Sequence, residues 1–194
     1  MLFWIKQGIQ SFILSVGYKH EKIIEYFGNE FRGIKIDYSI ESAPLGTGGG
    51  LISSINQFKP DEDILVLNGD TFFEIDLKEL EVFHYKKKSD ITFSLFKSSD
   101  SDRYMCIKKD KSGRVVSMSE PIITHGFVNG GVYIMNPKLF SKLDYKIGDN
   151  ISLESEIFKE IFKSKARIYG KNFPSFFVDI GIPDDFFNAS KYLL

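Results

Sequence analysis

Residues 64–70 read Ile-Leu-Val-Leu-Asn-Gly-Asp, an apolar run followed by three polar or small residues. Four consecutive apolar residues predict a short strand that is buried on both faces, as is usual in a parallel sheet. The polar residues that follow leave the carboxylate of Asp70 just beyond the carboxyl end of this strand. Open α/β sheets bind ligands at that edge, because the loops there spread into a crevice. Gly69 would let a ligand approach the backbone closely.

Asp70 is therefore a candidate magnesium ligand, since Mg²⁺ takes oxygen ligands and is shared with substrate phosphates. The alternative is an aspartate that only caps or turns the chain. Asp70 and its neighbours alone do not distinguish these two interpretations, whereas motifs elsewhere in the sequence can.

Composition limits the class of protein. The chain has 194 residues, of which 43% are hydrophobic, and this is enough for one domain with a substantial core. A formal net charge of -1 gives no field that favours nucleic acid or an anionic membrane as a partner. The single cysteine, Cys106, excludes an internal disulfide framework and a multi-cysteine zinc site. Neither a membrane-span pattern nor a signal-peptide pattern is present, so we expect a cytoplasmic protein.

Hydrophobic periodicity predicts alternating strands and helices in the first half of the chain. The expected order is a helix end over 1–8, a strand over 12–16, a helix over 19–27, a strand over 34–38, a glycine-rich loop over 44–50 that enters a helix, the strand over 64–67 and a helix over 77–87. This alternation indicates α/β architecture with a doubly wound, Rossmann-like sheet.

The second half is richer in strands. Strands are expected over 91–96, 105–107, 115–118, 127–135, 167–169 and 176–178, with helices over 152–162 and from Pro183 onward. Ser152 is the expected N-cap of the first of these helices, with Ser155 as a weaker alternative, and Pro183 suits the first turn of the second. Without a linker or a repeat, residues 1–194 are expected to form one compact domain with a mixed sheet.

A run of glycines precedes one predicted helix: Leu45-Gly46-Thr47-Gly48-Gly49-Gly50. Such a run can fold closely around a planar or anionic group and offer it backbone amides. It is neither a P-loop nor the dinucleotide-binding fingerprint in its usual place. A purely structural entry into the helix is the alternative.

Two further groups of residues could carry chemistry. Asp179 follows an apolar strand, as Asp70 does, and two such carboxylates that converge at a sheet edge would hold one metal ion. Acids and glycines that could line a pocket for a hydroxyl-rich ligand are Glu120, Asn129, Gly130, Gly131 and Glu154. Each group taken alone is more typical of a turn or a surface position than of a binding site.

The order of these motifs resembles that of the sugar-1-phosphate nucleotidyltransferases. The matching segments are Pro44 to Gly49, Leu67-Asn68-Gly69-Asp70, Asn129 to Tyr133, and Val178 to Asp184. Within that family the sequence looks most similar to the D-glycero-D-manno-heptose 1-phosphate guanylyltransferases.

The resemblance implies a role for each motif. It implies that the nucleotide is bound by Leu45, Gly46, Thr47, Gly48 and Gly49, together with Asn68 and Gly69. It implies that Asp70 and Asp179 bind Mg²⁺ and are the catalytic acids. It also implies that Glu120, Asn129, Gly130, Gly131 and Glu154 face the sugar.

The implied reaction transfers GMP from GTP to a heptose or mannose 1-phosphate, giving a nucleotide sugar for polysaccharide, lipopolysaccharide or capsule biosynthesis. A phosphate oxygen of the sugar attacks the α-phosphorus in line and pyrophosphate leaves, so no protein nucleophile is needed. The alternative is an inactive remnant or regulatory subunit that keeps the sugar or nucleotide pocket.

The sequence departs from the family pattern in two places. Nothing in it matches the first strand and the Gly-Thr-Arg loop, which in the family hold the triphosphate, so the domain is expected to be truncated at its N-terminus. Such a chain is expected to be poorly soluble and to have little activity, unless the native protein is longer. The second departure is Pro121, which stands where the family often has a lysine.

Overall fold

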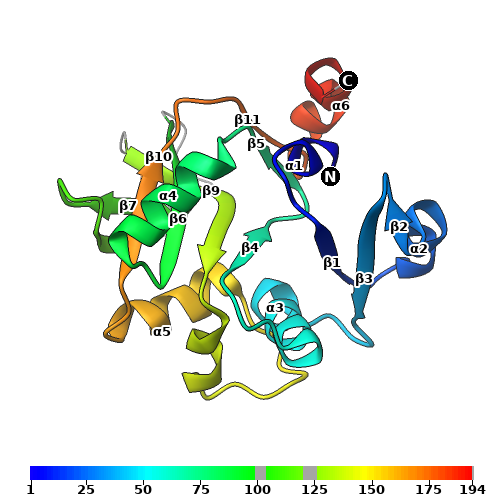
Figure 1. Ribbon diagram of the computed structural model, residues 1–194, viewed down its shortest axis with the longest axis horizontal. Helices are drawn as coiled ribbons and strands as arrows, with labels where there is room; N and C mark the ends of the chain where they lie inside the picture. The colour runs from blue at the N-terminus through cyan, green and yellow to red at the C-terminus, as the bar shows by residue number, and fades with distance from the viewer. Residues whose placement is uncertain (99–103, 120–125, 194) are drawn as a thin grey trace. The chain divides into compact units, whose positions relative to one another are not determined.

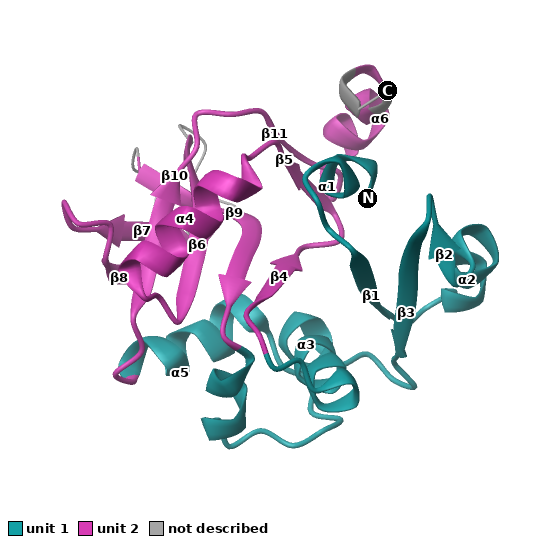
Figure 2. Ribbon diagram, in the orientation of Figure 1, with its two compact units in different colours: residues 1–61, 137–163 teal, residues 62–136, 164–194 magenta. Residues whose placement is uncertain are grey.

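The computed structural model describes residues 1–98, 104–119 and 126–193 (Figure 1). The chain divides into two compact units, each made of two segments (Figure 2). Unit 1 comprises Met1–Asp61 and Pro137–Lys163, and unit 2 comprises Glu62–Asn136 and Ser164–Leu194. The single domain expected over residues 1–194 stays a prediction.

Unit 1 contains a three-stranded sheet. β1 (Ser11–Val16) pairs in parallel with β3 (Ile34–Ile40), and β2 (Glu30–Phe31) pairs antiparallel with the other edge of β3. The helices of this unit are α1 (Leu2–Lys6), α2 (His20–Phe27), α3 (Gly46–Phe58), a 3₁₀ helix (Pro137–Lys142), a π turn η2 (Leu153–Ile157) and α5 (Phe158–Lys163). α3 packs on β1 and β3. Among the described residues, β1 has a partner strand on one edge only.

Unit 2 is built on a six-stranded sheet in the order β10-β6-β9-β7-β8, with β4 paired to β9 beside this path. Its strands are β4 (Ile64–Leu67), β6 (Ile91–Ser98), β7 (Cys106–Lys109), β8 (Val115–Ser119), β9 (Gly126–Met135) and β10 (Ile168–Asn172). β10 and β6 are parallel, and the other neighbours in this sheet are antiparallel. The sheet is therefore mixed, as the sequence predicted.

Three more elements complete unit 2. β5 (Thr71–Phe73) and β11 (Phe177–Asp179) form a separate antiparallel pair. α4 (Leu77–Lys87) packs on β6, β9 and β10, and α6 (Pro183–Leu193) follows β11. No helix in the described part of the chain is both long enough and apolar enough to span a bilayer.

The burial predicted for the stretch 64–67 is wrong. β4 pairs antiparallel with β9, and all four of its residues are half-buried. The reason is that β4 has one partner strand within the described residues, so it lies at a sheet edge. An apolar run indicates a strand, but it does not distinguish an edge position from a central one.

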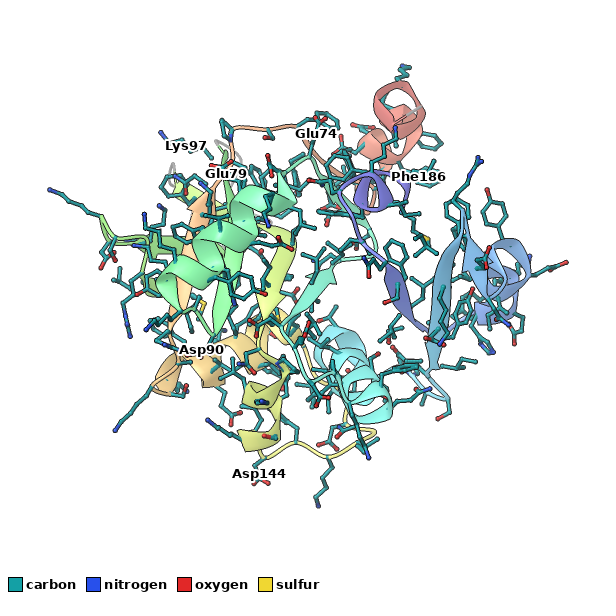
Figure 3. All side chains as sticks on the ribbon, viewed as in Figure 1. Glu74, Glu79, Asp90, Lys97, Asp144 and Phe186 are labelled. Carbon is teal, nitrogen blue, oxygen red and sulfur yellow. The ribbon has the colours of Figure 1, made fainter. Side chains whose placement is uncertain are left out.

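Ion pairs join the helix and the strands of unit 2. Lys171 Nζ on β10 lies 2.7 Å from Glu79 Oε1 on α4. Asp90, just before β6, accepts hydrogen bonds from both the backbone and the guanidinium of Arg167, just before β10. Figure 3 shows the side chain of Glu79 on α4 and that of Asp90 at the start of β6. The parallel pair β6–β10 is thus held by side chains as well as by its backbone.

His84 is a buried packing residue of α4, with 1% of its surface exposed. Its Nε2 lies 3.2 Å from Asp63 Oδ2, and its Nδ1 lies 2.8 Å from Thr92 Oγ1. Because a carboxylate only accepts, Nε2 carries the proton of the neutral ring and Nδ1 accepts from the Thr92 hydroxyl. Burial lowers the pKa of His84, although the charge of Asp63 acts in the opposite direction.

The stability of the fold should therefore fall in mild acid. The unfolded chain takes up a proton on His84 near pH 6.5, whereas the folded protein resists protonation until the pH is lower. As the pH falls from about 6.5 toward the lower pKa of the folded state, the unfolded state binds more protons, so His84 should lower the free energy of unfolding by at most about 1.4 kcal/mol per pH unit in that window. Urea unfolding at about pH 7.5 and about pH 5.5 measures this difference, which should be smaller in His84→Gln than in the parent protein. With His20→Gln as the control, an equal pH effect in all three proteins would contradict the assignment.

Candidate functional site

The antiparallel pair β5–β11 brings Asp70 and Asp179 together in unit 2. Asp70 immediately precedes β5, and Asp179, the last residue of β11, is paired with Thr71. The backbone amide of Ile180 donates a hydrogen bond of 2.8 Å to the carbonyl of Asp70. A Cβ placed on Gly181 would lie 2.9 Å from Asp179 Oδ1 and 3.7 Å from Asp70 Oδ2, so one point lies within 4 Å of both carboxylates.

The carboxylate of Asp179 is held by two hydrogen bonds. The backbone amide of Gly181 donates to Oδ1 at 2.9 Å, and the hydroxyl of Tyr104 donates to Oδ2 at 3.2 Å. Asp70 itself is exposed. Sequence reasoning missed Tyr104, because nothing in the residues around it indicates that its hydroxyl reaches an acid 75 positions later.

This pair of acids fits a hard cation that is shared with a substrate. Among the described residues there is no group of three or more His, Cys, Asp or Glu side chains that could hold a metal ion. The described residues therefore do not form a metal site in which the protein supplies all the ligands. Mg²⁺ is commonly bound by one or two carboxylates and completes its shell with water and phosphate oxygens, which suits two adjacent aspartates.

Gly130 and Gly131 lie at a bulge of β9. Between Phe93 and Leu95, β6 advances two positions, while β9 runs from Tyr133 to Asn129. A Cβ on Gly130 would overlap the ring of Phe73, and a Cβ on Gly131, which has a φ of +72°, would lie 2.5 Å from Thr71 Oγ1. The glycine pair therefore makes room for β5, which carries Asp70 at its start.

Asn129 stabilises this bulge with its buried side chain. Its Oδ1 accepts from the amide of Gly131 at 3.1 Å, and its Nδ2 donates to the hydroxyl of Tyr133 at 2.5 Å. Asn68 lies beside the bulge, because its amide donates to the carbonyl of Gly131 at 2.9 Å. A Cβ on Gly69 would meet nothing within 4 Å, so the backbone there borders open space. The roles expected for these residues toward a sugar or nucleotide stay predictions.

The glycine run of unit 1 lies inside a helix. α3 begins at Gly46, so the prediction of a loop over 44–50 is wrong for residues 46–50. The reason is a long-range contact: the carbonyl of Ile151 accepts from the amides of Gly48 at 2.8 Å and Gly49 at 3.2 Å. A Cβ on Gly46 would lie 2.5 Å from the same carbonyl, and one on Gly49 would overlap the carbonyl of Asp149. These glycines let the segment 149–151 pack against the first turn of the helix.

The hydroxyl of Thr47 connects two of the predicted binding groups. It donates to Glu154 Oε2 at 2.9 Å and accepts from the amide of Leu153 at 2.9 Å. Glu154 lies in the π turn η2, which begins at Leu153 and is capped by Ser152. The hydroxyl of Ser152 accepts from the amide of Ser155 at 3.1 Å, as expected for an N-cap. Thr47, from the nucleotide group, and Glu154, from the sugar group, thus lie together in unit 1. Leu45, also from the nucleotide group, is buried.

The predicted site residues therefore fall into two sets, one in each unit. Unit 1 holds those of the glycine run and Glu154, and unit 2 holds Asn68, Gly69, Asp70, Asn129, Gly130, Gly131 and Asp179. Glu120, which was expected on the sugar side, lies outside the described residues.

Three comparisons with known proteins, by family model, by sequence and by structure, point to the same kind of protein. A sequence model of the family described as "Nucleotidyl transferase" matches residues 2–194. The D-glycero-alpha-D-manno-heptose 1-phosphate guanylyltransferase of Aneurinibacillus thermoaerophilus is 39% identical over 99% of this chain and 83% of its own length. The enzyme of the same name from Campylobacter jejuni subsp. jejuni is 40% identical over 94% of this chain and 79% of its own length. The crystal structure of HddC from Yersinia pseudotuberculosis complexed with GMP-PN matches with a TM-score of 0.83 and 29% identity, and covers 100% of this chain and 83% of that one.

The packing role of the bulge glycines can be measured as stability. In Gly130→Ala the new methyl group overlaps the Phe73 ring, so we expect the free energy of unfolding to fall by about 1–3 kcal/mol. Gly69→Ala is the matched control, because its methyl group meets no atom within 4 Å and its φ is not positive. The control should stay within about 0.5 kcal/mol of the parent in urea unfolding. Equal midpoints for the two variants would show that Gly130 is not required for packing.

Proposed function

This chain belongs to the nucleotidyl transferase family, and from that membership we propose that it transfers GMP from GTP to a sugar 1-phosphate of the heptose or mannose type. The two guanylyltransferases that act on heptose 1-phosphate, by their names, share 39% and 40% identity with nearly the whole chain. A similar structure, that of HddC, contains GMP-PN. The products would be a GDP-sugar and pyrophosphate. The cytoplasm is the compartment expected for such a reaction.

The observation that carries this proposal is the convergence of Asp70 and Asp179 at the β5–β11 pair. Two carboxylates within 4 Å of one point repel an anion on their own, so phosphates require a cation between them. We propose that both aspartates hold Mg²⁺ there. When bound there, Mg²⁺ would supply positive charge that neutralises the charge developing on the phosphate oxygens.

The protein residues position the reactants rather than form a bond with them. Phosphoryl and nucleotidyl transfers depend on alignment and charge stabilisation, so a sugar phosphate oxygen attacks the α-phosphorus and pyrophosphate departs on the opposite side. The hydrogen bonds of Gly181 and Tyr104 keep the carboxylate of Asp179 turned toward one position. Exposed Gly69, beside Asp70, leaves the backbone open to a phosphate or a base.

Thr47 and Glu154 are the proposed contacts of unit 1. The carboxylate of Glu154 can accept a hydrogen bond from a sugar hydroxyl, and its bond with Thr47 sets its orientation. The first turn of α3, with Gly46 to Gly49, is proposed to lie against the nucleotide. Gly46 and Thr47 are exposed there, whereas Gly48 and Gly49 are buried and their amides already donate to Ile151. Backbone contact with the base is therefore expected at the exposed Gly46 and Thr47 more than at Gly48.

Pyrophosphate release tests the proposed function. Each of GTP, ATP, CTP and UTP would be combined with heptose, mannose and glucose 1-phosphates in the presence of Mg²⁺. We expect release with GTP and a heptose or mannose phosphate, and a GDP-sugar of the matching mass. Nucleotide binding by calorimetry without any pyrophosphate release would instead support a regulatory subunit that keeps the pocket. Release with another triphosphate alone would overturn the assignment of GTP.

Removing one charge from the acid pair should strongly reduce turnover. Asp70→Asn keeps the shape of the side chain but removes charge from a preorganised site, so kcat should fall by roughly 10²-fold or more. Glu62→Gln removes a carboxylate charge from an exposed position in the same unit and should leave kcat unchanged. Steady-state pyrophosphate release measures both variants, and circular dichroism checks that both are folded. Parental turnover and Mg²⁺ dependence in Asp70→Asn would exclude Asp70 from the site.

A further inference from the structure

Tyr104 contacts both an aromatic cluster, through its ring, and the carboxylate of Asp179, through its hydroxyl. It precedes β7, and its hydroxyl donates to Asp179 Oδ2 at 3.2 Å. Its ring packs against two others, with centroids 6.0 Å from Phe96 and 5.5 Å from Phe177. Phe96 and Phe177 stack on each other at 4.2 Å. The ring of Tyr104 is therefore held by one residue from β6 and one from β11.

The geometry of β11 explains why one tyrosine reaches both its ring partner and the acid. Phe177 and Asp179 are two positions apart on the strand, so their side chains lie on the same face. Tyr104 can therefore pack its ring against the first and donate its hydroxyl to the second. The position of its hydroxyl is set by aromatic packing rather than by a flexible chain.

The second oxygen of Asp179 is also engaged. Oδ1 accepts from the amide of Gly181 at 2.9 Å, and a Cβ placed on Gly181 would lie 3.7 Å from Asp70 Oδ2 as well. With a donor on each oxygen, rotation of the Asp179 carboxylate would break one of the two hydrogen bonds. Each carboxylate oxygen carries two lone pairs, so both oxygens keep a lone pair for a cation.

We propose that Tyr104 is a positioning residue that orients Asp179 toward the cation shared with Asp70. This inference rests on the proposed role of Asp179 and goes beyond it, because Tyr104 itself is not a ligand. Residues that hydrogen-bond to metal ligands set their orientation, and losing one typically costs about 10–100-fold in metal affinity or activity. The hydroxyl of Tyr104 orients the carboxylate of Asp179, and the packing of the ring sets the position of that hydroxyl.

Direct metal binding tests this role without relying on turnover. Mn²⁺ would serve as the probe, with free Mn²⁺ measured by electron paramagnetic resonance during titration of the protein. Tyr104→Phe keeps the ring and removes the hydroxyl, so its melting temperature should change little while the Kd for Mn²⁺ rises by about tenfold. The Mg²⁺ concentration that gives half-maximal pyrophosphate release should rise by a similar factor. Tyr85→Phe, an exposed position on α4, is the matched control and should bind Mn²⁺ as the parent does.

Two further variants separate the possible outcomes. Tyr104→Leu removes both ring and hydroxyl, so the proposal expects its Kd for Mn²⁺ to match that of Tyr104→Phe even where its stability is lower. Parental Mn²⁺ binding in Tyr104→Phe, with a weaker Kd in Tyr104→Leu alone, would assign Tyr104 a packing role and overturn the proposal. Asp179→Asn should lose Mn²⁺ binding at this position. If Asp179→Asn binds Mn²⁺ as the parent does, the proposed metal site fails, whatever Tyr104→Phe shows.

Discussion

The candidate site of unit 2 depends on the pairing of two three-residue strands, β5 and β11. One backbone hydrogen bond, from Ile180 to the carbonyl of Asp70, joins the chain just before β5 to the chain just after β11. Strands this short gain little from their own hydrogen bonds, so packing must stabilise the pair. Phe73 supplies that packing: it is fully buried and contacts the rings of Phe96, Phe173 and Phe177. An aromatic core thus sets the spacing of the exposed Asp70 and the half-buried Asp179.

In both units, glycines allow another segment of the protein to pack closely against the backbone. In unit 2, Gly130 accommodates the Phe73 ring and Gly131 accommodates Thr71, so the bulge of β9 allows β5 to lie against it. In unit 1, Gly46 and Gly48 allow the carbonyl of Ile151 to approach the first turn of α3. In each case the space beside the glycine is filled by the protein itself. The glycines shape the surroundings of the predicted site residues through packing, whether or not they also touch a ligand.

Local signals predicted much of the fold. α4 runs from Leu77 to Lys87 as expected, because Asp76 caps it and its apolar spacing is regular. The proximity of Asp70 and Asp179 was expected from their places after two apolar strands, yet β5 was missed, since three residues are too few to show a period. The helical state of Gly46 to Gly50 depends on Ile151, about a hundred positions away, and Tyr104 reaches Asp179 across a similar gap in sequence. Both interactions come from tertiary structure, which local sequence patterns do not encode.

The π turn η2 has a consequence for how this protein can evolve. In this turn the amide of Ile157 donates a hydrogen bond to the carbonyl of Ser152, five positions earlier, whereas each amide of an α-helix donates to the carbonyl four positions earlier. A π turn accommodates one more residue than the α-helical turn it replaces. Deleting a single residue here would restore an α-helix and rotate Glu154 by about 100° relative to buried Phe158 and Ile161 of α5. Lineages that keep the Thr47–Glu154 contact are therefore expected to conserve the length of this segment more strictly than its sequence.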